Sequence, residues 1–461
     1  MNERPKTWAA ATLEDICEVI QGQSPPGSSY NQIGNGLPFY QGKAEFGDLY
    51  PAPRKWCTAP TKVAEEGDVL LSIRAPVGPT NLCPSRSCIG RGLAAIRSRD
   101  GIPTKFVLYA LRRMEPKLSE MGTGSTFKAI SGDTIRSVIL SISPLSEMHR
   151  IVAAIEEHLS RLDAAVAALK RVRAALPRYR AAVLKAACEG KLVNGNGSPT
   201  NEPIPSGWTL TSLAKLKTRS LYGPRFSSDL YSDEGPLVLR TTDITDGGKV
   251  NLETAPRIRI DRDDFERYRV LPGDLLFTRT GSLGTVALFD DNVEAIPGAY
   301  LIQYRIAAPI ATARYVLRFF QSPDAQRMLL KKGAGVGRPN LNAPSIEAIP
   351  IPLPPLTEQE AILNEIDRRF SLADAAERVV EAGLAKAKRL RQAILNRAFE
   401  GKLVPQDSND EPASALLERI KAERAATVET KPSGRGNAAQ KMMLTSPTQA
   451  ANFALDHQER L

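Results

Sequence analysis

Two arginines follow the apolar run in two copies of one short motif, and their surroundings favour binding chemistry. The motif GDVLLSIRAPVG, residues 67–78, aligns with GDLLFTRTGSLG, residues 273–284, at an offset of 206. The first copy places Arg74 after a short apolar run, and the second places Arg279 after another, one position earlier in the motif. A guanidinium at the end of a hairpin presents forked N–H donors that suit base edges and phosphates. The structural alternative for each arginine is a salt bridge with the nearby Asp68 or Asp274.

Further loops carry amide, hydroxyl and basic side chains of the same kind. They include two glycine-rich stretches, residues 122–126 and 333–342. A surface ion pair or a hairpin-shaping contact explains any single one of these residues equally well. Only the set, which occurs twice in parallel, supports a shared role in binding nucleic acid. The candidate DNA-contacting residues are Gln41, Lys43, Arg74, Thr126, Lys128, Arg240, Thr241, Thr242, Arg279, Thr280, Ser282, Lys332, Arg338 and Asn340.

Residues that could support catalysis are few. The chain has three histidines, two on a long helical segment and one near the C-terminal end, which does not favour a His-based triad or metal site. Cys83 and Cys88 lack a second pair and are expected to be buried thiols rather than zinc ligands. No GxxxxGK[ST] phosphate loop occurs, and the glycine string at 333–337 precedes Pro339 instead of opening a helix. We therefore expect no catalytic residue, no metal and no cofactor.

Charge and composition indicate a protein that binds polyanions through shaped surfaces. The formal net charge is +10, with 17 − 13 = +4 over residues 1–143 and 19 − 16 = +3 over residues 205–354, so the excess is spread over both halves. The five cysteines are scattered, and neither a signal-peptide core nor a membrane-length apolar run occurs. These features predict a cytoplasmic protein without a membrane partner.

An internal duplication supplies the elements that must position the candidate residues. Residues 144–193 and 355–404 align without a gap at an offset of 211, with 20 of 50 positions identical. Ser146 and Thr357 are expected N-caps, Gly190 and Gly401 expected helix stops, and Pro177 a possible kink. Apolar residues at alternating spacings of three and four predict coiled-coil seams, with separate core helices in globular domains as the alternative. The two seams are Ile151, Ile155, Leu159, Leu162, Val166, Leu169, Val172 and Leu176, and Ile362, Ile366, Phe370, Ala373, Val380, Leu384, Ala387, Leu390 and Ile394.

The flanking segments repeat as well, although with little identity. Short apolar runs, glycine turns and single predicted helices (103–114 and 314–330) recur in the same order, so we predict an α+β protein with two mixed α/β modules and two long antiparallel helices. The predicted segments are a first module at 1–143, a spacer helix at 144–193, a linker at 194–204, a second module at 205–354, a C-terminal spacer helix at 355–404, a short helical extension at 405–426 and a disordered tail at 427–461.

The order module–helix–module–helix, the run IPIPLPPLTEQEAI at 349–362, the motif GDLLFTRTGSLG and the EGKLV that closes both helices resemble the DNA-specificity subunit of Type I restriction–modification systems. The resemblance covers residues 1 to about 425. It implies two target-recognition domains, each reading one half of a bipartite site in double-stranded DNA, and an antiparallel helical spacer that sets the gap between the half-sites.

The resemblance also implies partners and a location. The subunit would dock two adenine methyltransferase subunits and, through them, restriction nuclease–translocase subunits, and it would associate with the nucleoid. The candidate partner-binding residues are Glu189, Lys191, Glu358, Gln359, Glu400 and Lys402.

Two other classes of protein are weighed against this reading. A fused methyltransferase–specificity enzyme would need an Asn/Asp-Pro-Pro-Tyr/Phe motif, which is absent from the chain. A coiled-coil scaffold that binds only proteins would have no need of paired arginine-bearing loops. A gel shift with DNA distinguishes the scaffold from a DNA-binding subunit.

Overall fold

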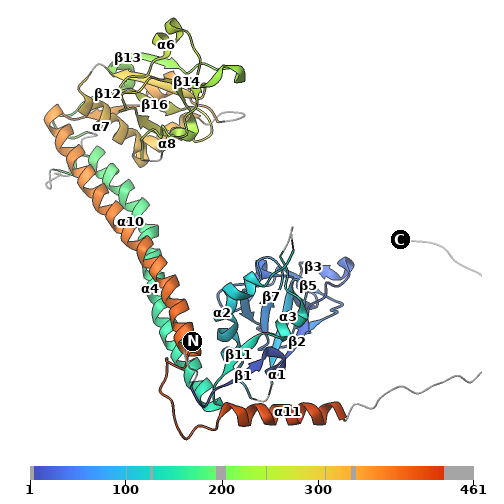
Figure 1. Ribbon diagram of the computed structural model, residues 1–461. Helices are drawn as coiled ribbons and strands as arrows, with labels where there is room; N and C mark the ends of the chain where they lie inside the picture. The colour runs from blue at the N-terminus through green and yellow to red at the C-terminus, as the bar shows by residue number, and fades with distance from the viewer. Residues whose placement is uncertain are drawn as a thin grey trace, which may run out of the picture. The chain divides into compact units, whose positions relative to one another are not determined.

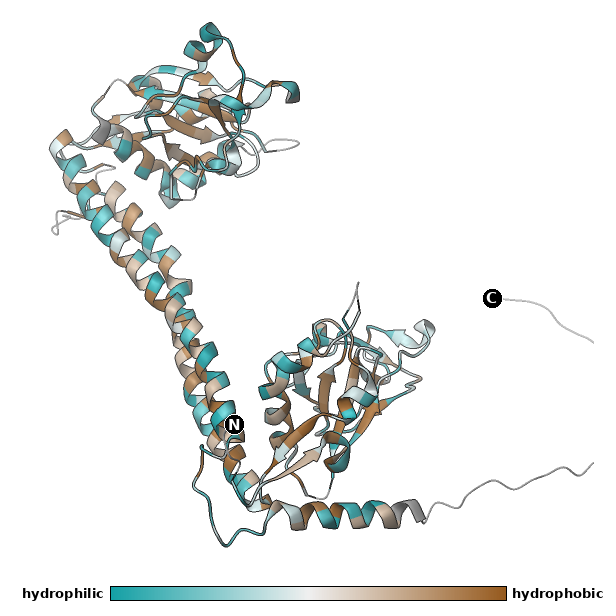
Figure 2. Ribbon diagram, in the orientation of Figure 1, coloured by the Kyte–Doolittle hydropathy of each residue, from teal (hydrophilic) through white to brown (hydrophobic). Residues whose placement is uncertain are grey.

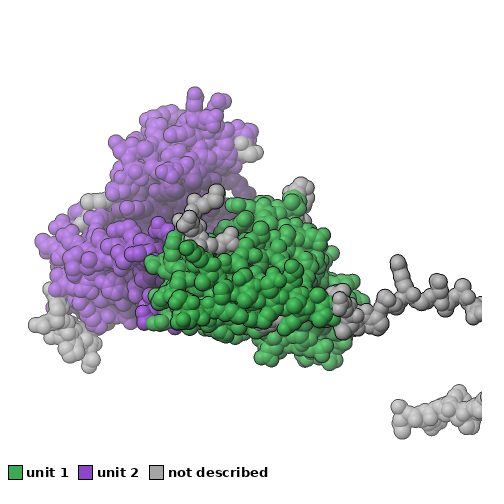
Figure 3. All heavy atoms as spheres, turned by 60° about the horizontal axis from the view of Figure 1, so that its bottom comes forward, with its two compact units in different colours: residues 1–158, 392–461 green, residues 159–391 purple. Residues whose placement is uncertain are grey.

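The computed structural model describes residues 5–99, 101–124, 128–193, 204–245, 247–306, 308–333 and 339–429. The chain divides into two compact units, residues 1–158 with 392–461 and residues 159–391 (Figure 3). Each unit contains one of the two modules together with one end of each long helix. Within the described residues, no helix is long and apolar enough to cross a membrane.

The duplicated segments form two uninterrupted helices of 44 residues each, α4 (Leu145–Cys188) and α10 (Leu356–Phe399). The helix α4 continues through Pro177 without interruption. Ser146 and Thr357 lie in the first turn rather than at the N-cap, which corrects the predicted capping. The reason is that the helices start two residues earlier than predicted, because the carbonyls of Pro144 and Pro355 already accept first-turn hydrogen bonds.

The second unit shows that the two helices run antiparallel (Figure 1). Arg173 bonds Glu381 at 3.1 Å, and Asp163 and Arg180 pair with residues on α10 in the same descending order. These ion pairs are largely exposed, and exposed pairs of this kind contribute about 0–1 kcal/mol each. The association of the helices therefore depends on their apolar seam.

The seam is only partly the one predicted. Ala373, Val380 and Ala387 are buried on α10, but Val172 and Leu390, which were expected on the seam, are 45% and 43% exposed. A straight α-helix has about 3.6 residues per turn, so a seven-residue apolar pattern drifts around a long helix. At Val172 and Leu390 this drift turns the side chain away from the partner helix and towards solvent.

The first module consists of small sheets with apolar strands at their centres. A four-stranded sheet has the order β2-β10-β7-β8, a five-stranded sheet the order β3-β5-β4-β9-β6, and β1 pairs with β11. The strands are β1 Ala9–Thr12, β2 Cys17–Gln21, β3 Tyr30–Asn31, β4 Leu37–Tyr40, β5 Lys55–Cys57, β6 Val63–Ala64, β7 Val69–Ser72, β8 Thr80–Leu82, β9 Ser87–Ile89, β10 Leu93–Ser98 and β11 Ile139–Ile142; the helices are α1 Leu13–Ile16, α2 Thr104–Glu120 and α3 Gly132–Arg136.

The second module repeats this frame. Its sheets have the orders β13-β19-β16-β17, β15-β14-β18 and β12-β20. The helix predicted over residues 314–330 is in fact two helices, α7 and α8, because the chain turns at Ser322 and Pro323. The strands are β12 Thr209–Thr211, β13 Lys217–Tyr222, β14 Tyr231–Leu239, β15 Arg257–Ile258, β16 Leu275–Thr278, β17 Val286–Leu288, β18 Ala295–Pro297, β19 Leu301–Ile306 and β20 Ile351–Leu353; the helices are α5 Leu213–Leu216, α6 Arg262–Tyr268, α7 Ile310–Gln321, α8 Pro323–Gly333 and α9 Ala343–Glu347.

The core strands β7 and β16 are short, almost wholly apolar runs because both of their faces are covered. Val69–Ser72 and Leu275–Thr278 are buried at every position. Figure 2 shows apolar residues concentrated on the central strands of each module and polar residues on the outer loops. In the second module, the apolar core continues onto the long helices through Leu184 and Ile366.

Both long helices end in the same glycine turn. Gly190 and Gly401 have positive φ angles of 67° and 70°, and the amides of Lys191 and Lys402 each donate to the carbonyl five residues earlier. This is the six-to-one bond of a Schellman ending, which confirms the predicted glycine stops. Pro205 packs closely over Gly190, and Pro5 packs over Gly401. Each module therefore begins against the end of a long helix.

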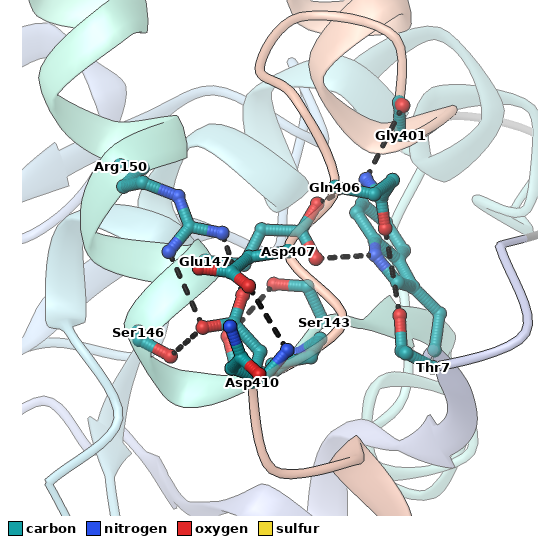
Figure 4. A network of polar contacts seen from close by, with 12 residues as sticks. Thr7, Ser143, Ser146, Glu147, Arg150, Gly401, Gln406, Asp407 and Asp410 are labelled. Carbon is teal, nitrogen blue, oxygen red and sulfur yellow. Dashed lines mark hydrogen bonds and ion pairs between the residues drawn. The ribbon is translucent and has the colours of Figure 1, made fainter.

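A tryptophan–glutamate hydrogen bond joins each module to the start of the other long helix in its unit. In the first unit, the Trp8 indole donates to Glu147 at 2.9 Å. In the second, the Trp208 indole donates to Glu358 at 3.1 Å. The segment after α10 reinforces the first joint, since the Gln406 amide also donates to Glu147, at 2.6 Å (Figure 4).

The surroundings of Glu147 show how a buried carboxyl is tolerated. Glu147 is only 1% exposed, and burial raises the pKa of its carboxyl in spite of the hydrogen bonds from Trp8 and Gln406. Beside it, Arg150 and Ser146 both bind Asp410, the former at 2.5 Å (Figure 4). The chain then forms α11 (Ala413–Glu429), whose Leu416 and Ile420 are buried; the tail predicted to be disordered lies outside the described residues after residue 429.

Replacing Glu147 by Ala should destabilise the first unit by about 1–3 kcal/mol, because the Trp8 indole and the Gln406 amide would lose their buried acceptor. Urea unfolding of the full chain, followed by tryptophan fluorescence, measures the change. Glu120→Ala removes an exposed carboxylate from the same unit and should shift the midpoint little. Equal midpoints for the two variants would contradict the role assigned to Glu147.

Candidate nucleic-acid interface

Arg279 is held at the end of β16 by backbone contacts on both sides. Its amide donates to the Tyr300 carbonyl at 3.0 Å, and its carbonyl accepts from the Leu341 amide at 2.9 Å. The guanidinium lies 4.8 Å from the centre of the Tyr222 ring and donates through Nε to Asn340 Oδ1 at 3.2 Å. The structure thus brings two predicted site residues, Arg279 and Asn340, together on an aromatic support.

In the first module Ile73, rather than Arg74, makes the backbone bonds that Arg279 makes, to the Gly92 carbonyl at 2.9 Å and from the Ile130 amide at 3.0 Å. Arg74 is the next residue, two positions after the end of β7. It forms an isolated bridge with Ala129, and the amide of Ala75 donates to the Lys128 carbonyl at 2.9 Å. Arg74 and Lys128 are therefore neighbours across the bridge, and both are exposed. Among the described residues, no ion pair holds the Arg74 guanidinium. Thr126 lies outside the described residues.

The nearby aspartates do not pair with these two arginines. Asp68 binds Arg97 through two hydrogen bonds of 3.0 and 2.9 Å. Asp274 binds Arg305 in the same bidentate manner, at 2.9 and 2.8 Å. Both aspartates are almost fully buried, so these pairs fix neighbouring strands within each module. The salt-bridge alternative for Arg74 and Arg279 is therefore wrong.

Arg240 has a structural partner as well as an exposed side. It donates to the buried Asp243 from Nε at 3.0 Å and from Nη2 at 2.9 Å, while its side chain stays 42% exposed. Burial would by itself raise the pKa of Asp243, but hydrogen bonds from Arg240 and Thr254 outweigh it and the pKa is lowered. Thr241 and Thr242 follow in a short 3-10 turn and line a cavity with Arg240.

The corresponding turn of the first module carries Gln41 and Lys43, both exposed. It follows β4 as the Arg240 turn follows β14, and the Gly42 amide bonds Glu45 at 3.0 Å where the Arg240 amide bonds Asp243 at 2.8 Å. The same backbone turn thus presents an amide and a lysine in one module, and hydroxyls and an arginine in the other.

The remaining predicted residues are less well connected. Thr280 and Ser282 lie in the turn after Arg279, Lys332 is exposed near the end of α8, and Arg338 lies outside the described residues. Exposed tyrosines were missed by sequence reasoning: Tyr222, Tyr231 and Tyr300 are 39%, 42% and 50% exposed. For Tyr222, which precedes Gly223, and for Tyr300, which follows Gly298 by two residues, the nearby glycine was a signal that could have found them.

The six candidate partner-binding residues have contacts within the chain. Glu358 accepts from Trp208, and Gln359 is buried with its amide donating to the Pro354 carbonyl at 2.8 Å. The lysine and glutamate of each EGKLV turn pair with each other, at 2.9 Å in the first copy and 2.8 Å in the second. These contacts show how the residues shape the helix ends; a role in docking partners stays a prediction.

The cysteines contribute no metal site. Within the residues that the structure describes, no group of three or more His, Cys, Asp or Glu side chains could hold an ion. Cys83 and Cys88 are buried free thiols, and burial raises their pKa to about 11 and about 12.

Comparison with known proteins assigns the family. The family described as "Type I restriction modification DNA specificity domain" matches residues 5–176 and 238–376, more than half of the chain and parts of both modules. The chain belongs to this family. It is therefore a DNA sequence-specificity protein of a Type I restriction–modification system, and DNA and the other components of such a system are its partners. The family, fold class and function predicted from the sequence are confirmed.

Individual relatives agree. The EcoBI specificity subunit of Escherichia coli is 26% identical over 453 residues, covering 91% of this chain and 93% of that protein. The EcoKI specificity subunit of the same species is 26% identical over 454 residues, covering 92% and 97%. A putative MjaX specificity subunit of Methanocaldococcus jannaschii is 37% identical over 195 residues, 42% of this chain and 45% of that protein. A specificity subunit is named apart from the methyltransferase and nuclease subunits, in keeping with a non-catalytic role.

Solved structures share the fold. One, from work on complex assembly and conformational transition of the type I R-M system, has a TM-score of 0.65 at 19% identity and covers 87% of this chain and 99% of its own. The HsdS subunit of Thermoanaerobacter tengcongensis has a TM-score of 0.52 at 20% identity and covers 87% and 98%.

Replacing Arg279 by Ala should weaken DNA binding by roughly 1–3 kcal/mol and relax base preference at one half of the target, if the guanidinium contacts a base edge in this specificity protein. Competition binding against single-base variants of the target measures both effects. Arg368→Ala removes the same charge from an exposed position on α10 and serves as the control. A uniform loss for all sequences, with a salt slope lower by about one ion, would identify a phosphate contact instead.

Proposed function

We propose that each module reads one half of a bipartite DNA sequence, and that the two helices set the gap between the half-sites and dock the methyltransferase subunits. The observation that carries this proposal is the difference between the modules on a shared frame. The same turn presents Gln41 and Lys43 in one module and Thr241 and Thr242 in the other, whereas the buried pairs Asp68–Arg97 and Asp274–Arg305 are alike. Two modules that share these buried ion pairs but differ in their surface residues are suited to recognising two different DNA sequences.

The long helices support the role of a spacer. The first turns of α4 join the first module through Glu147, and its last residues, such as Leu184, belong to the core of the second module. A helix rises about 1.5 Å per residue and resists bending. The number of residues in the helices therefore sets the distance between the two modules. The partners expected from the sequence resemblance are two adenine methyltransferase subunits and, through them, the nuclease–translocase subunits, on DNA in the nucleoid.

A gel shift with the purified chain, with and without its methyltransferase partner, tests the function against the alternative of a protein-binding scaffold. Specific retardation of DNA carrying the bipartite site is expected, most strongly with the partner present. A chain that binds the methyltransferase but gives the complex no sequence preference would support the scaffold.

The purified chain should transfer no methyl group to DNA by itself, because catalysis belongs to the partner subunits. Incubation with labelled S-adenosylmethionine and target DNA should show background incorporation only, and addition of the methyltransferase subunits should restore transfer at the target adenines. Robust transfer by the chain free of partners would overturn the assignment.

Lengthening both helices by one turn should lengthen the gap and leave the half-sites unchanged. Leu169 packs beside Gly383, so four residues inserted after Ala168 and four after Leu384 lie nearly opposite each other. The insertion adds about 6 Å, which corresponds to one to two base pairs at roughly 3.4 Å each. Selection of preferred sites from a library with randomised gaps measures the change.

A two-residue insertion at the same places is the control. It turns the rest of each helix, beyond the insertion, by about 200° around the helix axis and should abolish specific binding. An unchanged gap after the four-residue insertion would show that the helices do not set the spacing.

A further inference from the structure

The second module contains a cavity of about 410 Å³ beside its predicted DNA-contacting turn. Phe226 and Val238 contribute apolar lining, and the loop at Gly298 closes one side. Tyr231 and Tyr300 stand at the cavity, and so do the side chains of Arg225 and Arg240. We call this feature the Tyr300 pocket. A cavity of this size lies in the range typical of small-molecule sites.

The two tyrosines of the pocket are unusually open to solvent. Tyr300 is 50% exposed and Tyr231 is 42% exposed, although large aromatic rings are normally buried. An exposed ring beside an apolar hollow offers a stacking surface, and every nucleobase has a π-face that can stack on it. The pocket is therefore chemically suited to a flat aromatic ligand.

The two arginines are fixed rather than free to follow a phosphate. Arg225 donates to the Tyr300 hydroxyl at 3.3 Å, which positions the ring and the guanidinium together. Arg240 is held by Asp243 through two hydrogen bonds, so its charge is largely compensated and its plane is fixed. A guanidinium plane held in this way suits stacking on, or donation to, a base.

The shape of the pocket decides which part of DNA could fill it. Bases in an intact duplex are read by side chains that protrude into a groove, such as Arg279 on its hairpin. A hollow in the protein can be filled only by a group that leaves the duplex. A phosphate would find apolar side chains, Phe226 and Val238, in this hollow. We propose that the Tyr300 pocket takes a nucleobase extruded from the target DNA; this proposal rests on the proposed function of the module as a reader of one half-site.

The first module cannot offer the same pocket. Gly298 donates to the Leu239 carbonyl at 2.8 Å as Gly90 donates to the Tyr40 carbonyl at 2.9 Å, and the two loops correspond residue for residue. The counterpart of Tyr300 is therefore Gly92, and a Cβ there would lie 2.3 Å from the Gln41 carbonyl oxygen. A side chain does not fit at this position. Extrusion is consequently expected only at the half-site read by the second module.

Binding to mismatched DNA by the full complex with its methyltransferase tests the proposal. A mismatch lowers the cost of unstacking, so a mismatch at the extruded position should tighten binding several-fold. Mismatches are placed one at a time along the half-site of the second module. In Tyr300→Ala the tightening should disappear and binding to matched DNA should weaken about ten-fold, whereas Tyr300→Phe, which keeps the ring, should retain both.

Two controls separate the pocket from other sources of the effect. A base that the methyltransferase itself extrudes gives a tightening that persists in Tyr300→Ala, so only a tightening that depends on Tyr300 counts. Tyr50→Ala removes a tyrosine of the first module that is also 50% exposed and should change nothing. Tyr231→Ala provides a second variant of the pocket and should also lose the tightening.

The proposal is overturned if no mismatch tightens binding in a manner that depends on Tyr300. It is also overturned if Tyr300→Ala weakens association with the methyltransferase instead of with DNA, which would make the pocket a protein-binding site. In both cases the wild-type complex would still bind its matched bipartite site specifically, so the proposed function would stand. Loss of that specific binding in the wild-type complex would contradict the proposed function itself.

Discussion

The hydrogen bond from a module's tryptophan to the glutamate in the first turn of a long helix is the contact on which both units depend. Trp8 and Glu147 make it in one unit, and Trp208 and Glu358 make it in the other. A proline at the start of each module packs over the glycine that ends the other helix, Pro5 on Gly401 and Pro205 on Gly190. Each module is thus attached to the start of one helix and the end of the other. An antiparallel helix pair places those two ends side by side.

A repeated contact also stabilises the inside of each module. A buried aspartate and an arginine on the neighbouring strand tie the central sheet together, in the pairs Asp68–Arg97 and Asp274–Arg305. Because those aspartates are already occupied, the arginines at the hairpin ends, Arg74 and Arg279, are available for contacts outside the core. The frame can therefore stay constant while the loops on it differ, which is what a protein needs if it reads two unlike sequences with two copies of one fold.

The differences between the loops are local and have clear causes. At one place in the frame, the first module has Gly92 pressed against a carbonyl, and the second has Tyr300, which stands half exposed beside a cavity. The turns after β4 and β14 share their hydrogen bonds and differ in the side chains they present. Such substitutions alter the surface without disturbing the sheets, since none of them enters a buried strand.

The sequence by itself determined the duplication, the two long helices with their glycine endings, the repeated modules and the family, because 20 identities in 50 aligned positions and an apolar spacing of three and four are properties of the chain alone. It also placed Arg74 and Arg279 after their strands. Only the tertiary structure decided which residues those two arginines and the neighbouring aspartates contact. Asp274 and Arg279 are near in sequence, yet Asp274 bonds Arg305, because adjacent strands bring residues 31 positions apart into contact. The exposure of Val172 and Leu390, and the gathering of Tyr231, Arg240 and Tyr300 around one cavity, likewise depend on packing between segments distant in the chain.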